Sequence, residues 1–168
     1  MRPPAIPLDH DMMDRDHQRI EALMAAASVT PDDGIADLHA ECARELAEHF
    51  RREEYMLRTE GFPGLHCHVA QHNILKFELD RLRVLSPALL RRALETSAPQ
   101  LILSHIGTMD RMAAAWLRGE LTDADRAILD AAYALPEKCR AAMQSFAIHT
   151  TLAEAFKASV PILALIEE

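Results

Sequence analysis

The sequence IADLHAECARELAEHFRREEYMLRTE, residues 35–60, predicts one long amphipathic α-helix. It contains no Pro or Gly, and it is rich in Ala, Leu, Glu and Arg, which favour helix. One face is apolar at steps of three and four residues, except where a histidine and a glutamate interrupt it. That face consists of Leu38, Cys42, Leu46, His49, Glu53 and Met56.

The segments on either side have the same helical character. Pro and Gly divide the chain, and helices are predicted over residues 12–27, 63–85 and 99–118, with a short helical piece starting at Ser86–Pro87. We find no convincing alternation of period two and therefore predict an all-α protein. Helices of this length joined by short loops favour an up-down-up-down four-helix bundle.

The C-terminal part of the chain predicts an addition to that bundle. We expect residues 1–118 to form the bundle with an N-terminal arm, and residues 119–168 to form a two-helix extension. Thr122 and Asp125 have the spacing of a capping box, and a second helix begins at Pro136. The extension is expected to pack on the bundle, with a homodimer interface as the alternative.

Composition excludes several classes of protein. The 168 residues carry 26 Asp and Glu against 18 Lys and Arg, a net charge of -8, so we expect no nucleic-acid partner. The apolar stretches are too short to span a bilayer, and the N-terminus lacks the apolar run of a signal peptide. Cys42, Cys67 and Cys139 form no CxxC pair and are interpreted as buried apolar residues. These features predict a cytoplasmic protein with no membrane partner.

Imidazoles and carboxylates interrupt the apolar face of each of the four long helices. They are His17, His49, Glu53, His68, His72, His105 and Asp110. A buried imidazole or carboxylate costs several kcal/mol unless it is paired. Seven of them directed into one bundle need a shared partner, and a metal centre is such a partner. Zinc usually takes four ligands, so seven fit two metals better than one.

The spacing of these residues indicates how they meet. The two pairs spaced i,i+4, one in residues 35–60 and one in residues 63–85, each place two ligand atoms on one helix face. His105 and Asp110 are five residues apart, roughly 140° around an α-helix. We therefore expect them to reach the centre from two sides, as a bridging carboxylate does.

The mixture of ligands favours iron. Five histidines and two carboxylates suit iron, whereas calcium and magnesium prefer oxygen ligands alone. A set with few carboxylates leaves more positive charge on a pair of irons, which favours the diferrous state. Our hypothesis is therefore reversible binding of O2 in preference to its activation.

Four strings of the sequence contain these ligands in a recognisable order. They are MDRDHQRIEAL at 13–23, HFRREEYM at 49–56, FPGLHCHVAQH at 62–72 and LILSHIGTMDRMAAAWL at 101–117. In this order of a lone His, HxxxE, HxxxH and HxxxxD, the chain resembles the bacterial hemerythrins, of the hemerythrin-like HHE cation-binding family. The resemblance covers about residues 10–118 and is specific because all seven positions match.

The resemblance implies how two iron ions (Fe²⁺/Fe³⁺) share the seven side chains. One iron takes His68, His72 and His105, the other takes His17 and His49 and keeps a position for O2, and Glu53 and Asp110 bridge the irons beside an oxo or hydroxo group. Ile106 is then a candidate for the apolar wall over the O2 pocket, where it slows autoxidation. The implied function is O2 carriage, storage or sensing, with another diatomic molecule or peroxide as the alternative ligand.

Other functions and other ligands stay open from the sequence. The alternatives to an O2-binding protein are a di-iron peroxidase, an enzyme that scavenges NO or peroxide, and an iron-handling protein. Glu54 is the rival of Glu53 and is expected to be solvated or to accept a hydrogen bond behind the ligands. His10 is the rival of His17 but lies in the Pro-rich arm.

Three further histidines are expected to play no part in ligation. We expect His39 on the surface and His66 in solvent, with a place behind the ligands as the alternative for His66. His149 lies on an apolar stripe, and a structural or interface position is expected for it.

Overall fold

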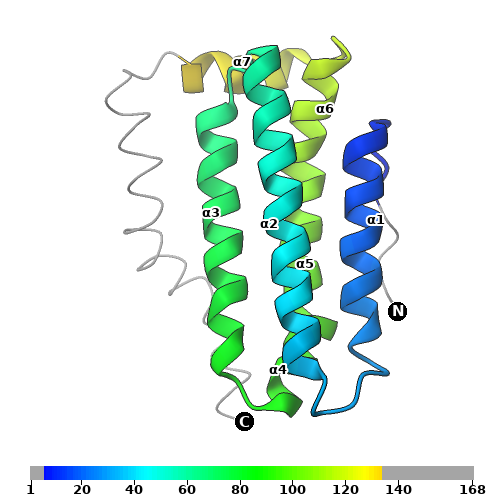
Figure 1. Cartoon of the computed structure of the whole chain (residues 1–168). Helices are drawn as coiled ribbons and strands as arrows, with labels where there is room; N and C mark the ends of the chain where they lie inside the picture. Colours follow the sequence, from blue (N-terminus) through cyan, green and yellow to red (C-terminus); the bar gives the residue numbers. More distant parts are fainter. Residues whose placement is uncertain (1–5, 134–168) are drawn as a thin grey trace.

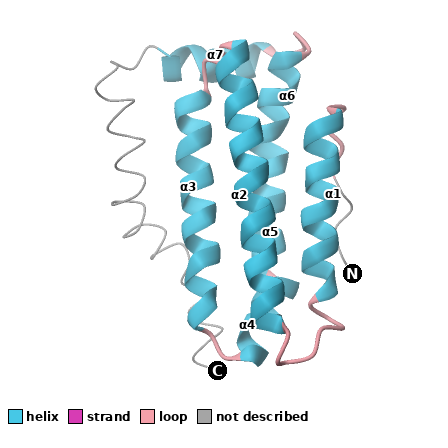
Figure 2. Cartoon of the chain, viewed as in Figure 1, coloured by secondary structure: helices cyan, strands magenta, loops and turns pink. Residues whose placement is uncertain are grey.

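The computed structural model of this chain describes residues 6–133, and among them it contains helices and no strand (Figures 1 and 2). The elements, in chain order, are α1 (Asp11–Ala26), α2 (Ile35–Glu60), α3 (Leu65–Arg81), the 3₁₀ turn η1 (Leu82–Val84), α4 (Pro87–Glu95), α5 (Ser97–His105), the π-helical turn η2 (Ile106–Asp110), α6 (Arg111–Leu117) and α7 (Asp123–Tyr133). The prediction of an all-α protein is confirmed for this part of the chain, and α2 has the bounds predicted from its sequence.

Four helical segments form a bundle. In Figure 1, α1, α2, α3 and the continuous segment α5–η2–α6 lie side by side, while the short α4 lies at one end and α7 crosses the other. α2 packs against both α1 and α3, and α5 packs against α3. The four segments of the bundle are those that carry the predicted metal ligands, so their inward faces share one interior.

Local signals set the ends of several helices. Gly61 ends α2 with a φ of 79°, a left-handed conformation that glycine adopts without strain. Thr122 Oγ1 accepts a hydrogen bond from Asp125 N at 3.1 Å and donates one to Asp125 Oδ2 at 2.7 Å, so Thr122 caps α7 as predicted, while Asp125 bonds the hydroxyl of Thr122 and not its backbone N–H. His10 Nδ1 accepts from Met13 N at 3.5 Å, so His10 caps α1.

The turn η2 changes the geometry that the sequence spacing had indicated. In a π-helical turn the backbone bonds i to i+5, so residues five apart lie nearly one above the other. His105 directly precedes this turn and Asp110 is its last residue, and His105 Nε2 lies 2.8 Å from Asp110 Oδ1. The expectation that they approach the centre from two sides is wrong, because it assumed the 100° step of a regular α-helix.

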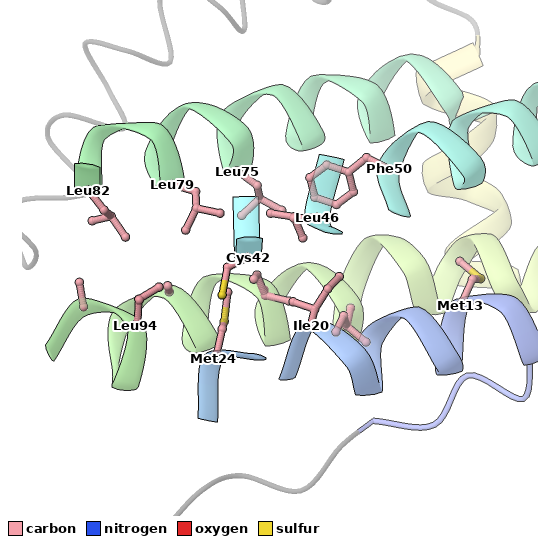
Figure 3. Packing of buried hydrophobic residues seen from close by; sticks show 14 of the residues in the cluster. Met13, Ile20, Met24, Cys42, Leu46, Phe50, Leu75, Leu79, Leu82 and Leu94 are labelled. Atoms are coloured by element: carbon pink, nitrogen blue, oxygen red, sulfur yellow. The ribbon is translucent and has the colours of Figure 1, made fainter. Parts of the chain in front are cut away.

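An apolar core fills the bundle beside the polar interior (Figure 3). Its side chains come from four different helices, and each of those named here is at most 5% exposed: Ile20, Met24, Leu46, Leu79 and Leu94. Full burial of one such side chain stabilises the fold by about 1.5–3 kcal/mol. This apolar packing offsets the cost of burying charged groups in the same bundle.

Two histidines expected at the surface are buried, and those predictions are wrong. His39 and His66 are each 6% exposed. His39 Nε2 donates to the backbone oxygen of Leu79 at 2.8 Å, which ties α2 to α3. At the start of α3, a Cβ on Gly64 would lie 2.7 Å from Leu129 Cδ2, so α7 closely covers that end. Neighbouring helices supply the burial, and the pattern of a single helix does not include them.

The described cysteines differ in burial. Cys42 is buried in the core, and this burial raises the pKa of its thiol to about 11. Cys67 is only half-buried, so the prediction of a buried apolar cysteine is correct for Cys42 alone of these two. Cys139 lies outside the described residues.

Part of the predicted extension also lies outside the described residues. α7 accounts for its first helix, but residues 134–168, including the helix expected from Pro136 and the residue His149, are not described. The division at residue 118, the packing of the extension and the homodimer stay predictions. Within residues 6–133, no helix is long and apolar enough to cross a bilayer.

Candidate metal centre

The structure brings all seven predicted ligand side chains together inside the bundle. None is more than 4% exposed: His17 from α1, His49 and Glu53 from α2, His68 and His72 from α3, His105 as the last residue of α5 and Asp110 as the last residue of η2. Their ligand atoms form two groups, each with all members within 4.8 Å of one another. Asp110 belongs to both groups, so it lies between them.

The larger group contains three histidines around two carboxylates. His68 Nε2 lies 3.3 Å from Glu53 Oε2 and 3.1 Å from Asp110 Oδ1. His72 Nε2 lies 3.2 Å from Glu53 Oε2, and His105 Nε2 lies 2.8 Å from Asp110 Oδ1. All three imidazoles therefore direct Nε2 at a carboxylate oxygen in the middle of the group.

The smaller group contains His17, His49 and the other oxygen of Asp110. His17 Nε2 lies 3.1 Å from Asp110 Oδ2 and 3.1 Å from His49 Nε2. His49 Nε2 also lies 3.6 Å from Glu53 Oε2. Asp110 thus presents Oδ1 to one group and Oδ2 to the other.

The donors of this centre are not satisfied by one another. Among the described residues, both carboxylate oxygens of Glu53 and of Asp110, and Nε2 of His68, are buried without a hydrogen bond of good geometry. The nitrogens of His17 and His49 face each other at 3.1 Å, where only one proton can lie between them. Buried charges without partners cost several kcal/mol. Nitrogen and oxygen donors in this number fit a pair of cations.

The ionisation of the metal-free centre also favours a site for cations. Burial and the neighbouring Asp110 oppose ionisation of Glu53, but the imidazoles of His68 and His72 prevail and lower the pKa of Glu53. Burial works against a charged imidazole, yet Glu53 and Asp110 raise the pKa of His68 to about 10. Burial lowers the pKa of His105, although Asp110 partly opposes it. Burial opposes ionisation of Asp110 as well, but hydrogen bonds from His105, His17 and His68 lower its pKa, so the metal-free centre favours ionised carboxylates beside a protonated His68.

Three of the five inward histidines have a partner at their outer nitrogen. His72 Nδ1 donates to Glu54 Oε1 at 2.9 Å, and His105 Nδ1 lies 3.3 Å from Gln71 Oε1. His49 Nδ1 lies 3.4 Å from Asp16 Oδ2. Such acceptors fix the ring orientation and make Nε2 a stronger ligand. Glu54 therefore accepts a hydrogen bond behind a ligand, which was one of its two predicted positions.

Sequence reasoning missed Asp16 and Gln71. Each immediately precedes a predicted ligand in the chain but contacts a histidine on another helix. No spacing along the sequence indicates such a contact. Asp16 and Gln71 can be found only once the packing of the helices is known.

Aromatic and aliphatic side chains surround the centre. The ring of Phe50 stacks on His72, with centroids 3.8 Å apart and planes inclined by 12°. Phe62 meets His68 and Trp116 edge-on, at 6.2 Å and 5.4 Å between centroids. Ile106, the predicted wall of an O2 pocket, is 1% exposed at the start of η2. Its function as a pocket wall stays a prediction.

Comparisons with known proteins agree with this geometry. A family model described as "Hemerythrin HHE cation binding domain" matches residues 8–132. The protein named "Bacteriohemerythrin" from Ralstonia nicotianae (strain ATCC BAA-1114 / GMI1000) is 33% identical over 105 residues, which span 61% of this chain and 76% of that relative. No solved structure matches the chain significantly.

Proposed function

Since this chain belongs to the hemerythrin HHE cation-binding family, we propose that it holds two iron ions inside the bundle and binds O2 reversibly there. One ion is held by the three histidines of the larger group and the other by His17 and His49. Glu53 and Asp110 would hold both ions from between the two groups. The observation that carries the proposal is the divided carboxylate of Asp110, whose Oδ1 faces His105 at 2.8 Å and whose Oδ2 faces His17 at 3.1 Å.

The unequal number of histidines supports O2 as the ligand. The smaller group contains two imidazoles and Asp110, whereas the larger contains three imidazoles, Glu53 and Asp110. An ion held beside His17 and His49 would therefore have fewer protein donors and could accept a small ligand. Bound iron supplies the electrons that O2 takes up on binding and returns on release.

The surrounding residues favour reversible binding. The ring of Phe50 lies between the two groups, stacked on His72 at 3.8 Å and 5.5 Å from the ring of His49, and Ile106 is buried directly after His105. An apolar surrounding excludes water and disfavours the separation of charge that accompanies loss of peroxide. In this proposal Phe50 and Ile106 help to exclude water from the centre, and neither side chain can donate a proton to a bound ligand.

The arrangement of the helices supports a common bundle for these ligands. Short connections link α1 to α2 and α2 to α3, as in the up-down-up-down order of a four-helix bundle. In the proposed function this topology brings the candidate ligands of four segments to one level of the interior.

Mixing the diferrous protein with O2 in a stopped-flow spectrometer tests the proposal. The expected result is a stable oxygenated spectrum that reverses under argon, with two irons per chain by metal analysis. Rapid decay to the diferric form with turnover of added peroxide would instead identify a peroxidase or scavenger. Binding of fewer than two metal ions per chain would contradict the two-ion centre itself.

A further inference from the structure

The ligand His49 is connected to the protein surface by two charged side chains. Its Nδ1 lies 3.4 Å from Oδ2 of Asp16 on α1. The guanidinium of Arg52 binds that same oxygen twice, from Nε at 3.0 Å and from its terminal nitrogen at 2.9 Å. The exposed fraction rises from 2% for the His49 side chain to 17% for Asp16 and 38% for Arg52.

The shared oxygen makes the two charges act against each other. A carboxylate that accepts a hydrogen bond from Nδ1–H of a metal-bound imidazole increases the electron density at Nε2 and strengthens the bond from Nε2 to the metal. A guanidinium on the same oxygen withdraws part of that charge, because both hydrogen bonds compete for one acceptor. Removing Arg52 should therefore strengthen the effect of Asp16 on His49, and removing Asp16 should abolish it.

We propose that Asp16 and Arg52 are positioning residues that set how strongly His49 donates to its metal ion, with Asp16 increasing the donation and Arg52 limiting it. The inference rests on the proposed function, since it requires a cation at His49. The affinity and reduction potential of this ion would then depend on two partly exposed side chains, Asp16 and Arg52. In the larger group the corresponding carboxylate is Glu54, whose Oε1 lies 2.9 Å from Nδ1 of His72.

Opposite effects of two neighbouring substitutions provide the test. Asp16→Asn should raise the reduction potential of the iron centre and weaken the binding of one Co²⁺ ion about tenfold, the lower end of what loss of such a partner costs. Arg52→Met should lower the reduction potential and leave Co²⁺ affinity equal to or above that of the unchanged protein. A structural contribution alone would give both substitutions the same sign, because both break the Asp16–Arg52 pair.

Arg51→Met is the matched control. Arg51 is the next residue on α2, it loses the same charge, and its guanidinium pairs with the exposed Glu48 at 2.8 Å. Its potential and Co²⁺ affinity should remain unchanged. In an Asp16→Asn background, Arg52→Met should lose most of its effect, since Arg52 acts through the carboxylate.

The outcomes separate failure of this inference from failure of the proposed function. If the unchanged protein binds no Co²⁺ or iron at all, the proposed centre and the inference both fall. If it binds two ions but Asp16→Asn and Arg52→Met shift the potential in the same direction, only the inference is overturned. The same holds if Arg51→Met shifts it as far as Arg52→Met, or if the effect of Arg52→Met persists without Asp16.

Discussion

Removing the cations should lower the melting temperature of the protein by about 10–20 °C. Two ion positions share Asp110, and each ion bound at a free concentration about 100 times its dissociation constant stabilises the fold by about 2.7 kcal/mol. Together they contribute about 5 kcal/mol, and in a chain of this size about 1 kcal/mol shifts the melting temperature by about 2–4 °C. The seven polar side chains lose their shared partner when the ions leave.

Substitution of Asp110 by Asn should reduce this difference between metal-bound and metal-free protein. Asp110 Oδ1 faces His68 and His105, and Oδ2 faces His17, so loss of its charge weakens both ion positions. The difference is the quantity to compare, because it is independent of how the substitution changes the metal-free protein. Asp80→Asn is the control, since that carboxylate is exposed and pairs with a surface arginine.

Scanning calorimetry under argon, with ferrous iron and with chelator, measures both quantities. Equal melting temperatures with and without metal would mean that the polar interior is satisfied in another way. An Asp110→Asn variant that keeps the full difference would show that this carboxylate does not join the two positions. Either result would refute the argument from the divided carboxylate.

Three further predictions follow from the same contacts. His68→Ala should lose bound metal, whereas His66→Ala should keep it, because His66 is also buried on α3 but lies outside the two groups. Metal analysis of both variants measures this. The reverse order would contradict the helix face assigned to the ligands. Because Glu53 and Asp110, against the effect of burial, raise the pKa of His68 to about 10, the metal-free protein carries a proton there near neutral pH. A cation must displace it, so metal affinity should rise between about pH 6 and about pH 8, with proton release measured by calorimetry in buffers of different ionisation enthalpy, and a pH-independent affinity would disagree. Phe50→Ala should lower the free energy of unfolding of even the metal-free protein by about 3–5 kcal/mol, since Phe50 is 1% exposed and stacks on an imidazole. Urea unfolding measures this. A loss below about 1 kcal/mol would mean that the surrounding side chains close the space left by the ring.

The helices of this protein and the identities of its ligand candidates could be predicted from local patterns. The absence of Pro and Gly from residues 35–60 and the glycine that follows predicted α2 with its observed bounds. The i,i+4 spacing of His68 and His72 predicted two inward imidazoles on one face, and both are buried. Such features involve residues within one or two turns, so the sequence contains them directly.

The contact between His105 and Asp110 could not be predicted from the sequence. The spacing of His105 and Asp110 indicated two different sides of a helix, and only the π-helical turn brings them within 2.8 Å. A regular step per residue was assumed, whereas the backbone adjusts where packing and side-chain contacts favour another turn.

The burial of His39 and the pairing of Asp16 with His49 were likewise decided by the tertiary structure. His39 is covered because α3 presents the carbonyl of Leu79 to it, and Asp16 contacts the candidate ligand His49 on another helix. The sequence by itself determined where the long helices lie and that the seven candidate ligands face inward, because periodicity is a property of neighbouring residues. Which outer partner meets which ligand depends on how helices distant in sequence pack, and only their arrangement in space fixes it.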